Sequence, residues 1–327
     1  MGKVILAADK WSGLRAPDPH LTALANGYRN KTLTGLNRIC PIVYSPKEAG
    51  TYTNWAPSPY IPIDRLRVGM TTKRLRIDVN NAKGGFATAQ YEVETAITDR
   101  ELKNVLEDDR ETYVEMKAMR GEDVVQLGME KFIADRWQDP ASFDAAFYEI
   151  LAGTNLWNDP ASDPAAKLRV VIKKMRLALQ TLRADIGVYM SDDVYDVFTE
   201  HPKVITRAVG TTGDDPDETR IAKMLRVGEV GTLAGSYSVT VDETAPDNSV
   251  SADLWSNICL VTLAAPAKPS PTTPIPGAIV RTDGMPEFEE YVDHTVAGGP
   301  ATVKVVKDNW GYAEISKKRV YAIRPLG

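Results

Sequence analysis

"LWNDPASDPAAKLRVVIKKMRLALQTLRADIGVYMSDDVYDVFTEHPKVI", residues 156–205, predicts a helix, a buried strand and a second helix in direct succession. In the first helix, Asp163 is suited to cap the N-terminus and Pro164 to occupy the first turn. Apolar residues recur at helical spacing and mark its buried face, at Leu168, Val171, Ile172, Met175, Leu179 and Leu182. The apolar run IGVYM then predicts a buried strand, and this order of elements is typical of the core of a mixed α/β domain.

The end of the same stretch concentrates carboxylates beside a histidine, which is what a metal or acid–base site requires. The residues are Asp192, Asp193, Asp196, Glu200 and His201. Helix physics explains the same residues, because acids in a first turn and a histidine near the last turn both complement the helix dipole. Ser191 is suited as the N-cap, and Val194, Val197 and Phe198 form the face directed at the core. We therefore interpret the acids as solvated or subunit-facing charges; a cation site formed by Asp193, Asp196 and Glu200 is the alternative.

Motifs of known chemistry are absent from the rest of the sequence. The glycine-rich dinucleotide and phosphate loops, the Gly-x-Ser-x-Gly nucleophile turn and the His-Glu-x-x-His zinc motif do not occur. His20, His201 and His294 lie far apart, and none has a second histidine at ligand spacing. We predict no catalytic, cofactor-binding or metal-binding residues, and no cofactor.

Composition indicates an ordinary globular protein from a reducing, intracellular environment. The chain has 327 residues, of which 43% are apolar, enough for two packed domains or one large one. Its two cysteines, Cys40 and Cys259, are too few for a disulfide framework. We find no secretion signal and no apolar run long enough to span a bilayer.

Charge is distributed unevenly along the chain. Residues 1–90 hold 13 Lys and Arg against 5 Asp and Glu, a balance of +8, whereas the remaining residues hold 26 against 39, a balance of −13. The basic part is either an arm that binds nucleic acid or an extended segment that lies on the acidic body of a neighbouring copy. We favour the second, because the basic residues are dispersed and no aromatic platform accompanies them.

Two features of this basic part predict an extended structure. Residues 1–50 show no sustained periodicity and carry four prolines, which predicts an extended arm. The segments RLRIDV and TAQYEV, residues 74–79 and 88–93, alternate apolar and polar residues around a turn, NNAKGG, at 80–85. This pattern predicts a β-hairpin. The hairpin is poor in apolar residues, so its basic side chains are expected to contact a neighbouring copy: Lys73, Arg74, Arg76 and Lys83.

A long helix and several strands are predicted beyond residue 93. Thr98 and Glu101 form a capping-box signature, and no proline follows until Pro140, so the pattern predicts a helix of about 55 Å that ends near Trp137. Gly121 and Gly128 are positions where it can bend, and two shorter helices are the alternative. Five prolines at 266–276 predict a connection, and residues 287–325 alternate as antiparallel strands that pack against the long helix.

The chain resembles the major capsid protein of tailed bacteriophages over essentially its whole length. The most specific part is residues 154–205, with its LW.D..SDP pattern and YMSDDVYDVFTEHP; SADLWSNICLVTLAAPA and KKRVYAIRP add support. The resemblance implies an α+β fold of the HK-type (Hong Kong phage) capsid class. In that fold, residues 1–50 would be the N-terminal arm and 51–93 the extended β-hairpin loop. Residues 94–150 and 277–327 would form a peripheral domain with a long spine helix, and 151–276 a mixed α/β axial domain.

The resemblance also implies a structural function without enzymatic activity. Subunits would self-assemble into hexamers and pentamers of an icosahedral shell that encloses double-stranded DNA without sequence-specific binding. Assembly would occur in the host cytoplasm, away from membranes, and place the protein in the virion, with scaffolding, portal and decoration proteins as further partners. No long charged segment precedes the arm, so scaffolding would be separate or the chain would begin after a processing site.

The hinge candidates for the different shapes of pentamers and hexamers are Gly84, Gly85, Gly121 and Gly128. Two alternatives remain open from the sequence. One is an encapsulin-like compartment shell, which holds a cargo enzyme in place of DNA. The other is a metal-dependent hydrolase that uses Asp193, Asp196 and Glu200.

Overall fold

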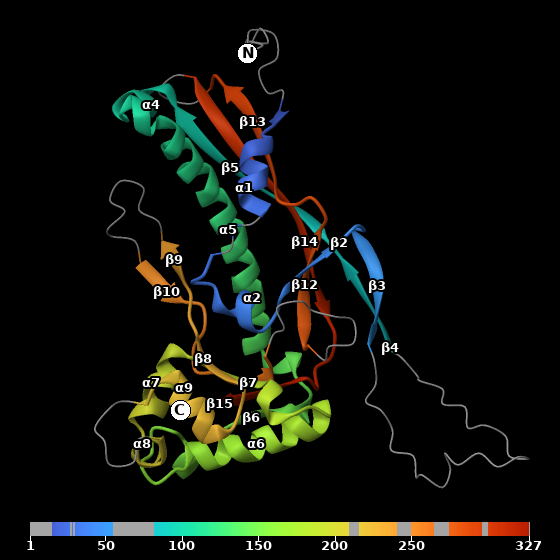
Figure 1. Cartoon of the computed structure of the whole chain (residues 1–327), viewed down its shortest axis with the longest axis vertical. Helices are drawn as coiled ribbons and strands as arrows, with labels where there is room; N and C mark the ends of the chain where they lie inside the picture. Colours follow the sequence, from blue (N-terminus) through green and yellow to red (C-terminus); the bar gives the residue numbers. More distant parts are fainter. Residues whose placement is uncertain are drawn as a thin grey trace, which may run out of the picture.

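The computed structural model describes residues 15–26, 28, 30–54, 82–208, 216–240, 250–264, 275–295 and 300–326. Two sheets organise these residues. The long helix α5 (Arg110–Gln138) and the long strand β14 (Ala301–Glu314) run beside each other along one half of the molecule (Figure 1). A second, smaller sheet with four helices forms the other half, so the predicted α+β class is confirmed.

The larger sheet has six strands around β14. Its order is β1 (Ala16–Pro17), β13 (Glu287–Asp293), β14, β12 (Gly277–Thr282) and β2 (Ile42–Ser45), and β5 (Ala89–Thr98) pairs with the other edge of β14. Every pair is antiparallel except β12 with β2. Helix α5 packs on this sheet at Gly121, where a Cβ atom would lie 2.8 Å from Val306 Cγ2. A glycine there allows the helix to approach the strand closely.

The second sheet is mixed and lies between two hydrophobic cores. Its order is β6 (Tyr148–Ile150), β15 (Val320–Arg324), β11 (Cys259–Leu263), β7 (Ile186–Ser191) and β8 (Glu229–Leu233). Residues of β7 alternate between the cores: Tyr189 contacts the core shared with α5, whereas Val188 and Met190 contact the core under the helices. This double burial explains why β7 is apolar throughout.

Four helices accompany the second sheet. They are α6 (Pro164–Leu179), α7 (Asp192–Glu200), α8 (Pro202–Ala208) and α9 (Glu218–Leu225). The predicted order of helix, strand and helix over α6, β7 and α7 is confirmed. Asp163 caps α6 through the Ala166 N–H at 3.0 Å, and Pro164 occupies the first turn, also as predicted.

The predicted absence of helices from residues 1–50 is wrong for the described part of that range. Helices α1 (Pro19–Asn26) and α2 (Thr34–Arg38) pack against α5 of the same chain, and Leu21, Leu36 and Ile39 are buried in its core. Helix α2 has no side-chain cap of its own. Instead, the Gly35 and Leu36 N–H groups donate to the Glu130 carboxylate of α5, at 2.8 and 2.7 Å. A cap supplied from a distant helix leaves no local sequence signal.

The predicted hairpin around residues 80–85 is also wrong for its described residues, 82–93. Residues 82–85 belong to strand β4 (Ala82–Ala87), which pairs with β3 (Ala49–Asn54) in a separate two-stranded ribbon. Residues 89–93 lie in β5 of the larger sheet, and 74–79 lie outside the described residues. Gly84 is not a turn residue: it pairs with Tyr52, whose ring occupies the space of a Cβ at that position. A second two-stranded ribbon consists of β9 (Ser236–Thr240) and β10 (Val250–Asp253).

The capping box at Thr98 and Glu101 is confirmed, but the helix that it starts is short. Helix α4 (Asp99–Asn104) ends at Val105, and a 3₁₀ turn at Glu107–Asp109 precedes α5. Helix α5 then continues for 29 residues, about 43 Å at 1.5 Å per residue, and includes both Gly121 and Gly128. Further 3₁₀ turns lie at Pro140–Ser142, Ala145–Phe147, Gly153–Asn155 and Arg183–Asp185. None of the described helices has the length and apolar character needed to span a bilayer.

Candidate functional site

The LWNDPASDP segment forms an internal contact with the junction of α7 and α8. Trp157 is buried, and its ring lies 5.4 Å from that of Phe198. Ser162 Oγ and the Asp159 carbonyl oxygen each lie 3.2 Å from His201 Nε2. The Lys203 N–H donates to His201 Nδ1 at 3.2 Å. The His201 ring is buried at the C-terminus of α7, where it joins the 157–162 segment to the start of α8.

Asp163 closes the same contact from the start of α6. Its two carboxylate oxygens accept from Arg207 Nη1 and Nη2 at 2.6 and 2.7 Å, a bidentate pair between α6 and α8. Burial raises the pKa of Asp163, but the hydrogen bonds from Arg207 and the Ala166 N–H outweigh burial and lower it below its ordinary value. The most specific sequence pattern of the chain therefore describes a packing unit, not a reactive site.

The acids of α7 lie on the exposed side of the helix, as predicted. Asp192, Asp193, Asp196 and Glu200 are exposed, whereas Val194 and Phe198 are fully buried. Burial, together with repulsion from Asp253, Asp196 and Asp193, raises the pKa of Asp192. Ser191 occupies the N-cap position of α7, as predicted, but its side chain does not cap the helix. Its Oγ donates instead to the Ile258 carbonyl oxygen and accepts from the Ile258 N–H.

Asp193 is engaged within the chain. Its Oδ2 accepts from the Asn257 N–H at 2.7 Å, which holds the loop before β11 against α7. Within the ranges that the structure describes, no three His, Cys, Asp or Glu side chains are grouped so as to hold a metal ion. The alternative of a cation site on Asp193, Asp196 and Glu200 is therefore not supported by their arrangement.

The other predicted contact and hinge residues are separated in the structure. Lys83 is exposed in β4, next to Gly84 and Gly85, whereas Gly121 and Gly128 lie in α5. The three remaining contact candidates fall outside the described residues: Lys73, Arg74 and Arg76. Gly121 is packed against the sheet, but a Cβ at Gly128 would meet no atom within 4 Å.

A buried charge centre links α5, β12 and β14, and the sequence patterns did not reveal it. Arg281 is 2% exposed, and its Nε donates to Asp308 Oδ1 at 2.8 Å. Its Nη2 donates to Glu122 Oε1 at 2.7 Å. Burial raises the pKa of Glu122 despite the neighbouring guanidinium. An arginine inside the apolar strand GAIVRT was the one available signal, because a charge there needs an internal partner.

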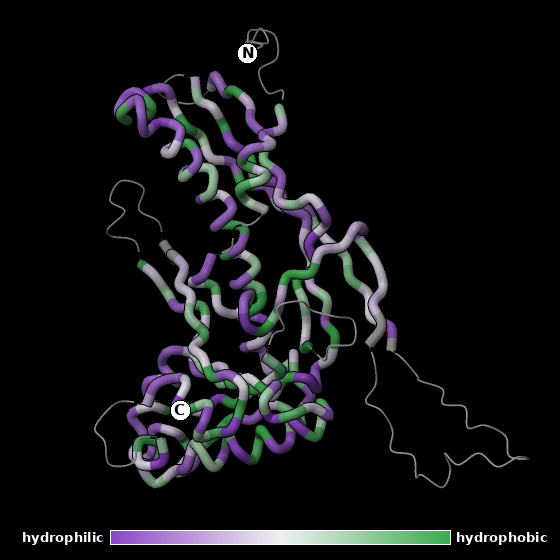
Figure 2. The backbone as a smooth tube through the Cα atoms, in the orientation of Figure 1, coloured by the Kyte–Doolittle hydropathy of each residue, from purple (hydrophilic) through white to green (hydrophobic). Residues whose placement is uncertain are grey.

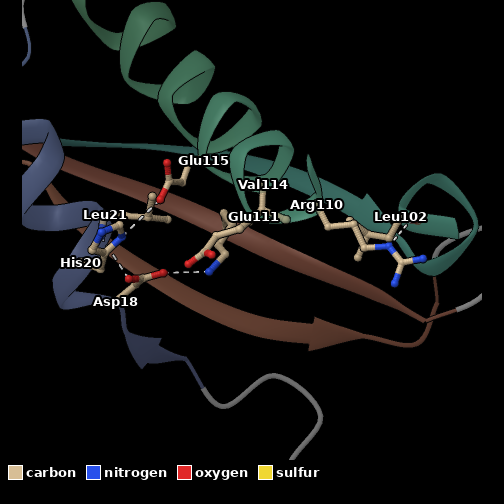
Figure 3. Close-up of a pocket in the computed structure, with 9 residues that line it drawn as sticks. Asp18, His20, Leu21, Leu102, Arg110, Glu111, Val114 and Glu115 are labelled. Carbon is tan, nitrogen blue, oxygen red and sulfur yellow. Dashed lines mark hydrogen bonds and ion pairs between the residues drawn. The ribbon is translucent and has the colours of Figure 1, made fainter. Parts of the chain in front are cut away.

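The structure also contains a hollow of about 400 Å³ between α1 and the start of α5 (Figure 3). Asp18 and Lys304 form an ion pair of 2.8 Å at its wall, and His20 Nδ1 lies 3.6 Å from Glu115 Oε1. Lys304 also contacts Glu290 at 2.7 Å, so its charge is neutralised within the chain. The residues that line the hollow include no nucleophile beside a base, and its ion pair joins the start of α1 to β14.

Comparison with known proteins relates this arrangement to phage heads. No family model matches the sequence. The major capsid protein of Pseudomonas phage JBD67 is 22% identical over 198 residues, 61% of each chain. That of Burkholderia phage BcepMu is 25% identical over 203 residues, 60% of this chain and 62% of the relative. The alignments thus span less than two thirds of these curated relatives.

Solved structures match over nearly the whole chain. A phage-related protein from Bordetella bronchiseptica RB50 matches with a TM-score of 0.71 and 20% identity, over 95% of this chain and 98% of that one. The capsid of cyanophage P-SCSP1u matches with a TM-score of 0.53 and 12% identity, over 91% and 89%. The mature capsid of bacteriophage PhiM1 gives 0.50 and 13%, over 91% and 87%. The chain therefore resembles phage major capsid proteins in sequence and has the fold of phage capsid proteins.

Proposed function

We propose that the chain is a major capsid protein that self-assembles into hexamers and pentamers of an icosahedral shell around packaged viral double-stranded DNA. The observation that carries the proposal is the match to the cyanophage P-SCSP1u capsid over 91% of this chain, at a TM-score of 0.53. The sequence similarity to two phage major capsid proteins agrees with it. The role is structural: the virion is the site of action, and assembly occurs in the host cytoplasm.

The same proposal divides the chain into the parts of an HK-type subunit. Residues 1–50 would be the N-terminal arm and 51–93 the extended loop. Residues 94–150 and 277–327 would form the peripheral domain, with α5 as its spine helix, and 151–276 the axial domain. The larger sheet with α5 supports the peripheral assignment as far as Glu314. Strands β6 and β15 pair instead within the second sheet, so 148–150 and 320–324 pack with the axial part. The described part of the arm packs within its own chain, with α1 and α2 on α5, β1 on β13 and β2 on β12.

The proposed loop would join neighbouring copies through its basic charge. The β3–β4 ribbon begins and ends this loop and is anchored on β14 of its own chain, where the Tyr52 hydroxyl donates to the Glu314 carbonyl oxygen. Lys83 is exposed at its edge, and the net charge of −13 beyond residue 90 supplies acidic surface on a neighbour. The same negative charge would prevent tight retention of DNA that must later leave the shell.

The change of shape between pentamers and hexamers is assigned to glycines. Gly128 is the hinge candidate we favour, because it is exposed in α5 and, unlike Gly121, is not packed against the sheet. Hinges at Gly84, Gly85 and Gly121 are also proposed. Of these, Gly121 has the least freedom to move because it packs against Val306. Scaffolding, portal and decoration proteins are the further partners of such a shell.

Electron microscopy of the expressed protein tests the proposal. We expect closed particles or capsomer rings, and DNA inside particles isolated from infected or induced cells. Monomers under all assembly conditions would contradict the proposal. Particles filled with a cargo enzyme in place of DNA would instead indicate an encapsulin-like compartment.

A charge reversal tests the role of the loop. Replacing Lys73, Arg74 and Arg76 with glutamate should reduce shell closure while the subunit still folds, because the loop would then repel an acidic neighbour. The measurement compares particle yield by microscopy with the unfolding transition of the subunit. Wild-type yields of normal particles would refute the charge-joining role.

A further inference from the structure

Helices α6 and α7 each carry charged residues of one sign only, and the two signs are opposite. The α6 sequence, PAAKLRVVIKKMRLAL, contains five cationic residues and no acid. The α7 sequence, DDVYDVFTE, contains four acids and no cationic residue. Surface helices of soluble proteins usually intersperse both signs, since pairs four residues apart stabilise the helix. Segregation on this scale leaves each helix without its own counter-charges.

The outward side of α6 combines these cations with exposed apolar side chains. At about 100° per residue, its members fall within about 120° of the helix circumference. They are Arg169, Val170, Lys173, Arg176 and Leu177, which we call the basic face of α6. Val170 is 66% exposed and Leu177 is 60% exposed. Neither Lys173 nor Arg176 forms an ion pair with another described residue, and the alternation along α6 in Figure 2 reflects its buried and solvated sides.

The outward side of α7 is the complement of that face. Its four acids lie within about 100° of the helix circumference and are all exposed. They are Asp192, Asp193, Asp196 and Glu200, which we call the acidic face of α7. After burial, repulsion from Asp253, Asp196 and Asp193 raises the pKa of Asp192, so Asp192 lies among like charges. An approaching cationic surface would relieve that repulsion.

The two faces do not meet within one chain. Helix α6 packs against β11 and β15, whereas α7 packs against β7 and β8, toward the other edge of the second sheet. In Figure 1, α7 lies at the left of this region and α6 extends to the right. A second copy can therefore present one face to the other without any rearrangement of the fold.

We propose that the basic face of α6 in one copy docks on the acidic face of α7 in a second copy. This inference rests on the proposed self-assembly and names the surfaces that join adjacent subunits. The contact is heterologous, because two different surfaces meet, and such contacts repeat around a closed ring. Val170 and Leu177 supply apolar area at the centre of the contact, and the surrounding charges select the partner and the register.

Paired charge reversals test the contact on the full chain. One variant carries Lys173→Glu and Arg176→Glu, which changes the basic face from +3 to −1. The other carries Asp192→Lys, Asp196→Lys and Glu200→Lys, which changes the acidic face from −4 to +2. Each variant alone should reduce ring formation at least 10-fold, measured by native mass spectrometry and sedimentation velocity. A chain with all five substitutions should assemble again, because the attraction is restored with the signs exchanged.

A mixture of the two variants gives a sharper result. In a 1:1 mixture, each attractive contact joins one variant to the other, so the subunits must alternate around the ring. Rings with an even number of subunits should form, and five-membered rings should not. A chain with Lys317→Glu and Lys318→Glu, two exposed lysines elsewhere on the same molecule, is the matched control and should assemble like the wild type.

Three outcomes would overturn the inference. The first is wild-type assembly by either reversed variant. The second is failure of both the combined variant and the mixture while circular dichroism shows folded subunits. The third is loss of DNA binding by the α6 variant with unchanged assembly, which would make the basic face a nucleic-acid surface. If the wild-type chain forms no rings or particles, the proposed function itself fails, and the inference fails with it.

Discussion

The region of the larger sheet and the region of the second sheet differ in where their charged side chains lie. The region of the larger sheet and α5 buries ionisable groups and pairs them internally, as with Arg281, Asp308 and Glu122. In the described part of the second region, the buried polar groups are hydroxyls and the imidazole of His201. Its carboxylates and cations are not fully buried: some pair within the chain, as Asp163 does with Arg207, whereas the basic face of α6 and the acidic face of α7 are exposed. Charge therefore fixes the arrangement of elements in the first region and remains available for contacts with other copies in the second.

The buried charge centre should show the largest effect on stability. Arg281→Met leaves Asp308 and Glu122 buried without their cation, which should cost about 3–5 kcal/mol in the free energy of unfolding. Urea titration of the isolated subunit measures it. The control adds Asp308→Leu and Glu122→Met, and this triple variant should recover most of the loss. If Arg281→Met lowers the free energy of unfolding by less than about 1 kcal/mol, the buried charges do not fix the arrangement of the first region, and the two regions do not differ in this respect.

The two glycines of α5 should respond in opposite directions. Gly121→Ala places a methyl group 2.8 Å from Val306 Cγ2, so it should destabilise the subunit by about 1–2 kcal/mol despite the gain in helix propensity. Gly128→Ala meets nothing within 4 Å and should stabilise it by up to about 1 kcal/mol. The measurement is the thermal unfolding temperature of the Gly121→Ala and Gly128→Ala variants, each compared with the wild type. Equal shifts for both would show that α5 does not pack as closely as described.

The buried carboxyl of Glu130 should make stability depend on pH. Burial raises the pKa of Glu130 above its ordinary 4.5, so the folded state holds a proton that the unfolded state releases. Its contribution is most favourable below about 4.5 and is lost as the pH rises through the folded-state pKa, with a slope of at most about 1.4 kcal/mol per pH unit. Glu130→Gln should remove this contribution to the pH dependence of the free energy of unfolding, because glutamine does not titrate. A stability difference between wild type and variant that does not change with pH would contradict it.

The surface charges of the second region should have the smallest effect on folding. Lys173→Glu with Arg176→Glu should change the free energy of unfolding by no more than about 0.5 kcal/mol, because both side chains are exposed and unpaired within the described residues. Chemical denaturation in parallel with the assembly assay separates the two effects. A change of several kcal/mol would mean that these charges support the fold, not the contact.

Local sequence signals predicted the elements that depend on neighbouring residues. Asp163 and Pro164 mark the start of α6, and the capping box at Thr98 and Glu101 marks the start of α4. Elements that depend on distant partners were missed. The cap of α2 comes from Glu130, almost a hundred residues away. Gly84, which the sequence pattern placed in a turn, makes room for Tyr52 across a strand pair.

The same division applies to the functional residues. The exposed acids of α7 were recognised because their spacing places them on one helix face. The centre at Arg281 joins three elements, and nothing in the spacing of those residues indicates that they meet. The unmixed charge of α6 and α7 is visible in the sequence, but its meaning depends on knowing that the faces lie on different sides of one region.

A cryo-electron microscopy map of the assembled particle tests the central claim most directly. We expect the map to show a closed shell of this chain. Around each ring, the basic face of α6 should meet the acidic face of α7 of the adjacent copy. Inside every subunit, Arg281 should remain paired with Asp308 and Glu122. A map in which α6 faces solvent or meets α6 of another copy would contradict the assigned contact. The absence of any shell under all assembly conditions would contradict the account as a whole.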